Sequence, residues 1–310
     1  MNRPSEDTAT STAVVIVSHQ CGPFLARAVR SVLASTVAVG VLVVDNGSTD
    51  GSPADLERAV GDDPRVRILR NDSNRGFAAA VNQGLAVARG PFVLLLNPDA
   101  VVEPDTIAGM LEAMQEHPDA GLAGGLILNP DGTEQSGARR SFPSLGRSFV
   151  RAFGLWRLGE RGRNHDFVHA GDPLPPGPVD VDAISGAFML VRRPALEQVG
   201  PMDEGYTLHC EDLDWCARFR QAGWRVLFVP QVRVIHEKGV SSRARPLFAH
   251  WHKHRGMIRF YRKFLAGQHP APVRLFVIAG VALRFLVLAP AVAAVALRRR
   301  WSRPREAGPA

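Results

Sequence analysis

Cysteine is scarce in this chain of 310 residues, which contains only Cys21, Cys210 and Cys216. Three cysteines cannot build the disulfide framework of a small secreted protein, and their number fits a reducing compartment. Cys210 and Cys216 are not at the spacing of a zinc finger, so a structural zinc is not expected. Residues 1–12 are polar and lack the basic and then apolar order of a signal peptide. We expect a disordered N-terminus there.

A glycine-rich phosphate loop is also missing. The first apolar run, residues 13–17, is followed by Ser18-His19-Gln20-Cys21-Gly22, where a dinucleotide-binding domain would have Gly-x-Gly-x-x-Gly. This absence argues against a nicotinamide or flavin enzyme. It also argues against a sugar nucleotidyltransferase, since we expect that chemistry to need a glycine-rich, basic loop at this place.

Acidic residues nearly disappear from the C-terminal part of the chain. Residues 241–310 hold 14 Lys and Arg but one acid, Glu306, for a net charge of +13, whereas the first 240 residues carry −6. A basic tail can bind nucleic acid or an anionic membrane surface. The tail has no recognised nucleic-acid-binding motif and little aromatic interleaving, so we favour the membrane and expect no nucleic-acid partner.

Apolar runs and helical patterns alternate along the rest of the chain. We predict strands at 13–17, 39–44, 66–69 and 92–96, and helices over 24–33, 56–60, 78–88 and 104–116. Such alternation with short connections is typical of a largely parallel, doubly wound α/β sheet. Residues 139–178 are rich in Arg, Gly and Pro and read as a long loop region. Order resumes with strands at 179–183, 188–191, 225–229 and 232–236, and with helices over 194–199 and 211–222.

One strand ends in a potential metal ligand. The apolar run 92–96 stops at Asn97-Pro98-Asp99, which places a carboxylate at the edge of the sheet where α/β proteins bind ligands. A carboxylate there can hold a divalent cation and, through it, a phosphate. The alternative is an Asn-Pro turn with a solvated Asp.

Three carboxylates lie close together in Glu211-Asp212-Leu213-Asp214-Trp215. Acids favour the first turn of a helix because they complement its positive end, and this reading requires no function. The functional alternative is that one of the adjacent pair, Glu211 and Asp212, faces a cleft. A like-charged neighbour raises the proton affinity of a carboxylate, which suits a general base.

His236 closes the last predicted strand and precedes the polar segment Glu237-Lys238-Gly239. An isolated His at a strand end is more often a packed residue than a ligand. Imidazole together with a carboxylate is nevertheless a reasonable ligand set for Mn²⁺ or Mg²⁺.

Taken in order, these segments resemble the family-2 glycosyltransferases of the GT-A fold, most closely the rhamnosyltransferase-like branch of bacterial surface-polysaccharide assembly. The resemblance extends over roughly residues 14–242. Its segments are VVDNGSTDG at 43–51, NRGFAAAVN at 74–82, LLNPD at 95–99, SGAFMLVRR at 185–193, GPMDE at 200–204, EDLDW at 211–215 and HEKG at 236–239.

The resemblance implies a role for each residue. Asp45 would contact the nucleotide base, and Asn74, Arg75, Gly76 and Asn97 would line the donor site. Asp99 would bind the metal that bridges the donor diphosphate, and His236 would complete that site. Gly186 would let donor and acceptor sugars approach the backbone. Asp212 would be the catalytic base with Glu211 supporting it, and we assign acceptor contacts to Asp214 and Trp215. The family has two Asp around one residue, and here Asn97 takes the first place.

The implied activity is inverting, Mg²⁺- or Mn²⁺-dependent transfer of a sugar from a nucleoside diphosphate to a lipid-linked saccharide. The best prediction is L-rhamnose from dTDP-L-rhamnose and an acceptor on polyprenyl diphosphate. An inactive, glycan-binding scaffold is the non-enzymatic alternative. The glycosyltransferase domain would cover residues 13–245, with 139–178 as its loop-rich insert.

The remaining segment, 246–310, is predicted to associate with the membrane. Residues 247–265 have the pattern of an amphipathic helix. Residues 275–297 are apolar except for Arg284, and as a helix they would span ~34 Å, enough for a ~30 Å hydrocarbon core. Three arrangements stay open: this helix lies in the interface, spans or re-enters the membrane, or packs on the catalytic domain. The first two place the enzyme at the cytoplasmic face of the bacterial inner membrane.

Overall fold

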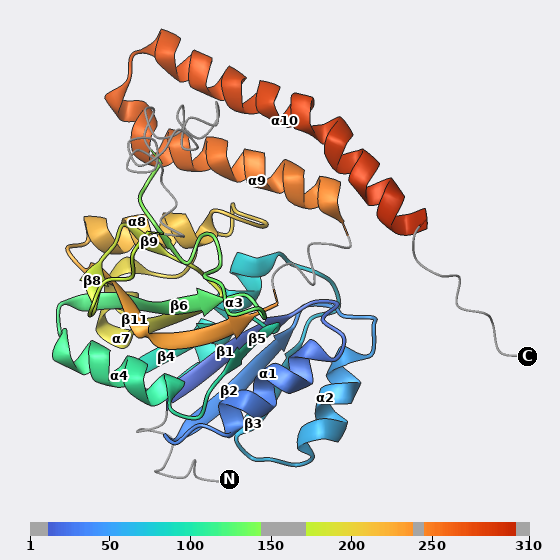
Figure 1. Ribbon diagram of the computed structural model, residues 1–310, viewed down its shortest axis with the longest axis vertical. Helices are drawn as coiled ribbons and strands as arrows, with labels where there is room; N and C mark the ends of the chain where they lie inside the picture. The colour runs from blue at the N-terminus through green and yellow to red at the C-terminus, as the bar shows by residue number, and fades with distance from the viewer. Residues whose placement is uncertain (1–11, 144–171, 238–244, 302–310) are drawn as a thin grey trace, which may run out of the picture.

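The computed structural model describes residues 12–143, 172–237 and 245–301 (Figure 1). Its centre is a nine-stranded sheet in the order β3-β2-β1-β4-β10-β6-β11-β5, with β8 paired to β11. The strands are β1 (Thr12–Ser18), β2 (Val39–Asp45), β3 (Val66–Arg70), β4 (Phe92–Leu96), β5 (Ala100–Val102), β6 (Ala120–Leu128), β8 (Val179–Asp180), β10 (Phe188–Arg192) and β11 (Arg225–His236). A small second sheet pairs β7 (Arg139–Arg140) with β9 (Ala183–Ile184).

The sheet is mostly parallel, as predicted. Strands β3, β2, β1 and β4 run in the same direction, and β6 is parallel to β11. Strand β10 joins the two parallel groups and is antiparallel to both β4 and β6. The predicted α/β fold, with a Rossmann-like sheet and flanking helices, is confirmed.

Helices cover both faces of the sheet because successive strand residues point to opposite sides. In β1, Val14 and Ile16 pack with α1 (Phe24–Leu33), α2 (Ser52–Val60) and α4 (Thr106–Glu116). Val15 and Val17 pack with α3 (Phe77–Val87), α7 (Arg193–Val199) and α8 (Glu211–Gln221). These four side chains, three valines and one isoleucine, are buried. Burial of each side chain stabilises the fold by about 1.5–3 kcal/mol. Burial of the sheet on both faces explains why its strands appear in the sequence as almost continuous apolar runs.

Strand β11 corrects one prediction. We expected two strands, 225–229 and 232–236, whereas one strand runs from Arg225 to His236. The pairing with β6 shifts register between Val229 and Arg233. Such an irregularity accommodates Pro230, which has no N–H to give to the ladder. The short strand β5 was not predicted, and its antiparallel pairing places His236 opposite Ala100, beside Asp99.

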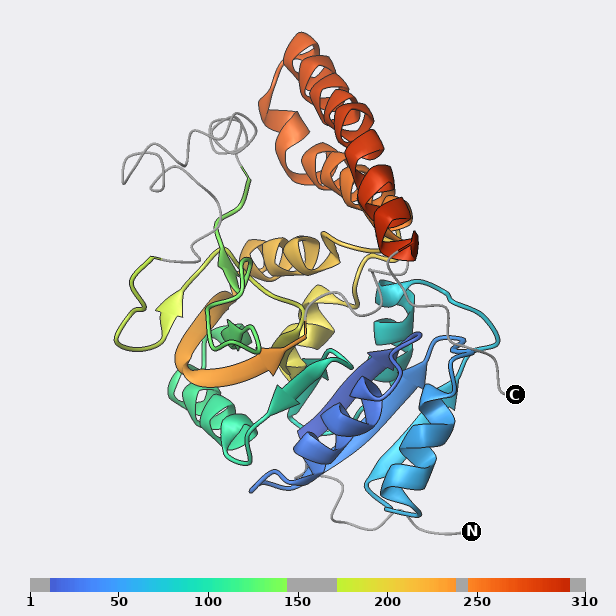
Figure 2. The same ribbon diagram turned by 45° about the vertical axis from the view of Figure 1, so that its right-hand side comes forward.

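Two C-terminal helices form a pair outside the sheet. Helix α9 (Pro246–Phe260) continues through a π-helical turn (Tyr261–Leu265) and a 3-10 turn (Ala266–Gln268) before α10 (Ala271–Trp301). The predicted helix over 247–265 therefore changes type near its end, and the predicted apolar run 275–297 lies inside α10. Figures 1 and 2 show the pair on the side of the sheet where α8 lies, with α10 along the far side of α9.

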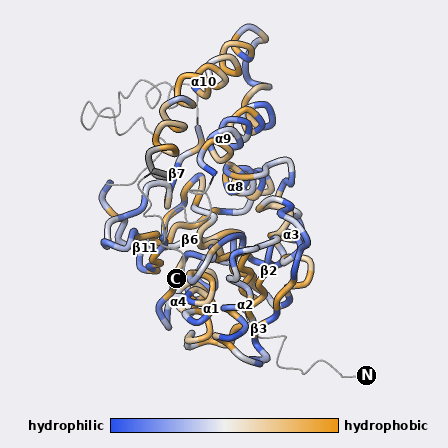
Figure 3. The backbone as a smooth tube through the Cα atoms, turned by 90° about the vertical axis from the view of Figure 1, so that its right-hand side faces the viewer, coloured by the Kyte–Doolittle hydropathy of each residue, from blue (hydrophilic) through white to orange (hydrophobic). Residues whose placement is uncertain are grey.

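Helix α10 exposes its apolar surface. Its segment Ala271–Leu297 is long and apolar enough to cross a membrane, and none of its most apolar window is buried. The hydropathy colouring in Figure 3 shows this helix as a largely hydrophobic element at the outside of the molecule. Within the described ranges, the main contact of α10 is with α9, so the arrangement in which this helix packs on the catalytic domain is not observed there.

Candidate active site

Most of the predicted site residues lie where the central strands end. Strands β1, β2 and β4 run in parallel, so their carboxyl ends meet at one edge with the start of β10 and the end of β11. That edge carries Asp45 at the end of β2, Asn97 and Asp99 after β4, Gly186 before β10 and His236 at the end of β11. The first residues of α8 join them through Asp212, which contacts Gly186.

The predicted nucleotide-binding residues belong to two loops that Asn46 connects. Asp45 is buried, and its Oδ1 accepts a hydrogen bond from the Ser48 N–H at 3.2 Å. The Asn46 side chain donates to Asn74 Oδ1 at 3.1 Å and accepts from the Arg75 N–H at 3.0 Å. Asn74 and Arg75 are exposed beside this anchor. Asn46 thus anchors the loop that contains Asn74 and Arg75, and the exposed side chains of these two residues remain accessible to a ligand.

Asp99 and His236 form a buried pair. His236 Nε2 lies 3.0 Å from Asp99 Oδ1 and 3.2 Å from Asn97 Nδ2. The other ring nitrogen, Nδ1, lies 2.7 Å from Gln135 Oε1. The two residues that the sequence places 137 positions apart are therefore neighbours in space.

This pair fits a divalent cation. Carboxylate oxygen and imidazole nitrogen are ligands of Mn²⁺, and two ligands at right angles ~2.1 Å from an octahedral ion are ~3.0 Å apart. Among the described residues, no group of three or more His, Cys, Asp or Glu side chains is placed to hold a metal ion. A cation at Asp99 and His236 would therefore take its other ligands from water and from a bound diphosphate.

Asp212 is held in place from two sides. Its Oδ2 accepts a hydrogen bond from Arg140 Nη2 at 2.5 Å and from the Gly186 N–H at 3.4 Å, and its Oδ1 accepts from the Leu213 N–H. Just before the acidic pair, His209 and Cys210 have φ of 68° and 70°. Left-handed backbone is costly for residues with a side chain, and such strain is frequent at functional sites.

Glu211 has a different environment from its neighbour. The residue is buried, and its Oε2 has no hydrogen-bond partner among the described residues. Burial, with the charge of Asp212, raises the pKa of Glu211 to about 8. Burial therefore favours the neutral form of Glu211.

Gly186 lies against the candidate base. A Cβ added at Gly186 would be 3.4 Å from Asp212 Cβ, an ordinary contact distance. A side chain at this position would therefore lie against Asp212, within 4.0 Å of its Oδ2. The contact with the sugars that the resemblance implies for Gly186 stays a prediction.

Asp214 and Trp215 are not placed at the surface of the site. Both are fully buried. Asp214 accepts hydrogen bonds from Arg218 at 2.8 Å and from Lys263 at 2.7 Å, and the Trp215 Nε1–H donates to the Gly200 carbonyl. The predicted acceptor contacts of these two side chains are not supported, because their polar atoms are already used inside the protein. Asp214 instead anchors the turn after α9 to α8.

Sequence reasoning missed three residues of the site: Asn46, Gln135 and Arg140. Asn46 follows Asp45 directly, and a polar residue just after a buried strand was an available signal. Gln135 and Arg140 lie in segments without periodicity, so nothing in the sequence connected them with His236 and Asp212.

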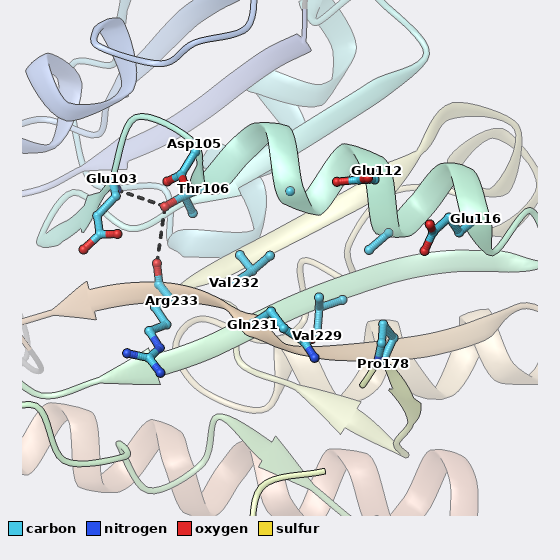
Figure 4. A pocket seen from close by; sticks show the side chains of 12 residues that line it. Glu103, Asp105, Thr106, Glu112, Glu116, Pro178, Val229, Gln231, Val232 and Arg233 are labelled. Carbon is cyan, nitrogen blue, oxygen red and sulfur yellow. Dashed lines mark hydrogen bonds between the residues drawn. The ribbon is translucent and has the colours of Figure 1, made fainter. Parts of the chain in front are cut away.

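A cavity lies elsewhere, between α4 and β11 (Figure 4). It has a volume of about 360 Å³, and none of the predicted site residues lines it. Its wall carries Glu103, Asp105, Glu112 and Glu116. A lining of this charge repels phosphate, so the cavity is not a nucleotide site.

Comparisons with known proteins agree with this geometry. The model of the family "Glycosyl transferase family 2" matches residues 13–200. The chain is 36% identical over 288 residues to the N-acetylglucosaminyl-diphospho-decaprenol L-rhamnosyltransferase of Mycobacterium tuberculosis. The matched region covers 87% of this chain and 90% of that protein. It is 25% identical to rhamnosyltransferase WbbL of Escherichia coli over 230 residues, 64% of this chain and 83% of that protein.

Solved structures support the fold. The mannosyltransferase PcManGT from Pyrobaculum calidifontis, solved with GDP-Man and Mn²⁺, superposes with a TM-score of 0.57 and 19% identity. The superposition covers 94% of this chain and 75% of that one. GalNAc-T7, solved with UDP, GalNAc and Mn²⁺, gives a TM-score of 0.55 at 19% identity over 74% of this chain and 44% of that one. The chain belongs to the family-2 glycosyltransferases, in the rhamnosyltransferase branch, and is an enzyme of the GT-A fold.

Proposed function

We propose that this enzyme transfers L-rhamnose from dTDP-L-rhamnose to a saccharide carried on a polyprenyl diphosphate, with inversion at the anomeric carbon. The observation that carries the proposal is the Asp212 carboxylate, held by Arg140 and Gly186 at the sheet edge to which Asp99 and His236 also belong. The relatives support the choice of sugar and acceptor, since one of them is named for rhamnosyl transfer to N-acetylglucosaminyl-diphospho-decaprenol.

The donor would occupy the loops after β2 and β3. Asp45 would meet the nucleotide base, and Asn74, Arg75 and Gly76 would line the rest of the pocket. Asn97 would close it beside the metal-binding pair. A divalent cation held by Asp99 and His236 would neutralise the charge that develops on the leaving diphosphate.

Asp212 would act as the general base. Its carboxylate takes the proton of an acceptor hydroxyl while that oxygen forms a bond to the anomeric carbon of the donor. The bond from the anomeric carbon to the diphosphate oxygen breaks on the opposite face, and the nucleoside diphosphate leaves. One displacement without a covalent intermediate inverts the configuration. The raised pKa of Glu211 favours its neutral form, which would add no second negative charge beside the base.

We also propose that the C-terminal helices bring the enzyme to the cytoplasmic face of the bacterial inner membrane. Support comes from the exposed apolar side chains of α10, among them Leu275, Phe276 and Leu286, and from the positive charge of residues 241–310. Apolar burial combined with attraction to anionic lipid is what holds interfacial helices on a membrane. A lipid-linked acceptor would be presented at the same surface.

The test uses the purified full chain, Mn²⁺ and vesicles that contain N-acetylglucosaminyl-diphospho-polyprenol. We expect transfer from dTDP-L-rhamnose, an inverted product by NMR, and loss of transfer in Asp212→Asn while the donor still binds. Asp62→Asn, at an exposed position before β3, is the control. Equal transfer by Asp212→Asn would remove Asp212 as the base. Donor binding without transfer by the wild type would favour the glycan-binding scaffold, and a retained configuration would exclude the single displacement.

A further inference from the structure

A chain of hydrogen bonds runs from the turn after β6 to His236. The Thr133 hydroxyl donates to Asp131 Oδ1 at 2.6 Å, and Asn129 Nδ2 lies 3.0 Å from Thr133 Oγ1. Gln135 Nε2 lies 3.0 Å from Asn129 Oδ1, and Gln135 Oε1 lies 2.7 Å from His236 Nδ1. Four of these five residues belong to a segment that carries none of the predicted site residues.

The chain has one direction, which Asp131 sets at its outer end. An ionised carboxylate can only accept hydrogen bonds. The hydroxyl and backbone N–H of Thr133 hold the pKa of Asp131 below its usual range, so this carboxylate is ionised at neutral pH. The Thr133 hydroxyl must therefore donate to Asp131, which leaves its oxygen to accept from the Asn129 amide. Asn129 then presents its carbonyl oxygen to Gln135.

The main chain confirms this direction independently at Gln135. Gln135 Nε2 also lies 3.1 Å from the His236 backbone carbonyl, which can only accept. Both neighbours of Nε2 are acceptors, so the amide nitrogen of Gln135 faces them and its Oε1 faces the imidazole. Gln135 is buried and cannot exchange these partners for water. An amide oxygen is an acceptor, and His236 must therefore carry a proton on Nδ1.

The consequence appears at the opposite ring nitrogen. With the proton on Nδ1, a neutral imidazole has a bare lone pair on Nε2. In this tautomer Asn97 Nδ2 donates a hydrogen bond to Nε2 at 3.2 Å, and Asp99 Oδ1 lies 3.0 Å from the same nitrogen. Two electron-rich atoms thus converge where a cation would bind, and the Asn97 amide stands beside them.

We propose that Gln135 is a positioning residue that fixes His236 as the Nδ1–H tautomer and so presents the Nε2 lone pair, together with Asp99, to a divalent cation. The inference rests on the metal-dependent transfer proposed above. The hydrogen bond at the second nitrogen of a ligating His determines its tautomer and its orientation, and loss of such a partner typically costs ~10–100-fold in metal affinity.

Nitrogen NMR of the metal-free protein tests the tautomer without any catalysis. The chain contains 10 His, and His236→Asn identifies the signals of His236 in a ¹⁵N-histidine sample. We expect the Nδ1–H pattern in the wild type and its replacement by the Nε2–H form or a mixture in Gln135→Leu. Gln115→Leu, at an exposed position on α4, is the control and keeps the Nδ1–H pattern. An Nδ1–H pattern that survives in folded Gln135→Leu overturns the proposal.

Gln135→Glu keeps the test decisive if Gln135→Leu does not fold. Its carboxylate still accepts from Nδ1–H, so the Nδ1–H pattern must persist, and its loss contradicts the proposal.

Titration with Mn²⁺ in the presence of dTDP, followed by electron paramagnetic resonance, measures the effect of Gln135 on the affinity for the cation. We expect affinity to fall ~10–100-fold in Gln135→Leu and to change little in Gln115→Leu. Equal affinities of wild type and Gln135→Leu refute the positioning role. No Mn²⁺ binding by the wild type contradicts both this cation role and the metal dependence proposed above, even where the tautomer result holds.

Discussion

Arg140 and Asp212 form an ion pair in which Arg140 Nη2 donates to Asp212 Oδ2 at 2.5 Å, although the residues are 72 positions apart. Arg140 Nη2 also donates to the Ile184 carbonyl at 2.7 Å. The guanidinium is thereby attached to β9, two residues before Gly186. Arg140 thus connects the candidate base, Asp212, to β9, the strand that precedes Gly186.

Replacing Arg140 by Met should reduce kcat roughly 100-fold or more, because the base loses the partner that orients it. We expect the affinity for dTDP to change little, since the hydrogen bonds of the Arg140 side chain within the described ranges go to Ile184 and Asp212 and not to the loops after β2 and β3. Steady-state kinetics and dTDP calorimetry separate the two effects. Arg67→Met, at an exposed position on β3, is the control. An unchanged kcat would show that Arg140 has no role in placing Asp212.

The raised pKa of Glu211 predicts how stability depends on pH. The ordinary value of 4.5 applies to the unfolded chain, and the folded value is about 8. Between these values the folded protein binds the extra proton, so the free energy of unfolding decreases as pH rises from about 4.5 to about 8 and levels off above it. Glu211→Gln should remove this decline and stabilise the protein at pH 9 by on the order of 1–3 kcal/mol.

Urea unfolding at pH 5, 7 and 9 measures this difference, with Glu112→Gln at an exposed position on α4 as the control. If Glu211→Gln and the wild type lose stability in parallel between pH 5 and 9, Glu211 is not the group that titrates.

Metal binding should depend on the donor. The described part of the chain offers Asp99 and His236 but no third acidic, His or Cys ligand beside them. We therefore expect weak Mn²⁺ binding to the protein alone and binding at least about tenfold tighter with dTDP, whose diphosphate supplies further oxygen ligands. Asp99→Asn should abolish the enhancement. Calorimetry that shows tight Mn²⁺ binding without dTDP would contradict this picture.

Gly186→Ala should separate activity from stability. The added methyl would lie at an ordinary contact distance of 3.4 Å from Asp212 Cβ, so we expect unfolding free energy to change by less than about 1 kcal/mol. The same methyl would occupy the space in front of the base, and kcat/KM should fall at least about tenfold. Thermal melts and acceptor kinetics test the two expectations. A variant with full activity would show that this space is not used by the sugars.

The exposed face of α10 should carry membrane binding. Leu283 and Leu286 are 61% and 63% exposed. Their joint replacement by Glu removes apolar area and adds negative charge, so binding to vesicles that contain anionic lipid should fall roughly tenfold or more. Val87→Glu, which changes a partly exposed valine on α3, is the control. Co-sedimentation measures the effect, and unchanged binding of the Leu283 and Leu286 variant would assign the membrane contact elsewhere.

Much of the fold followed from local patterns. Strand β4 was predicted at its observed bounds, and most of the other predicted strands and helices match within a few residues. Strand β5 was not predicted, and the predicted strand 179–183 is divided into β8 and β9, which belong to different sheets. A strand that is buried on both faces must be apolar throughout, and short connections between strands and helices favour parallel pairing. Asp99, Asp212 and His236 were selected because they follow or close such elements in an order typical of one family.

The sequence by itself determined the order of the elements, the family and the chemical types at the sheet edge, since these depend on residues that are close in the chain. Tertiary structure decided which of these residues meet. Gln135 reaches His236 across 101 positions, and Lys263 reaches Asp214 across 49. Burial of Asp214 and Trp215 depends on how α8 packs against elements that are distant in the chain, which no local pattern records. A side chain's role at such a site depends on partners that only folding brings within hydrogen-bonding distance.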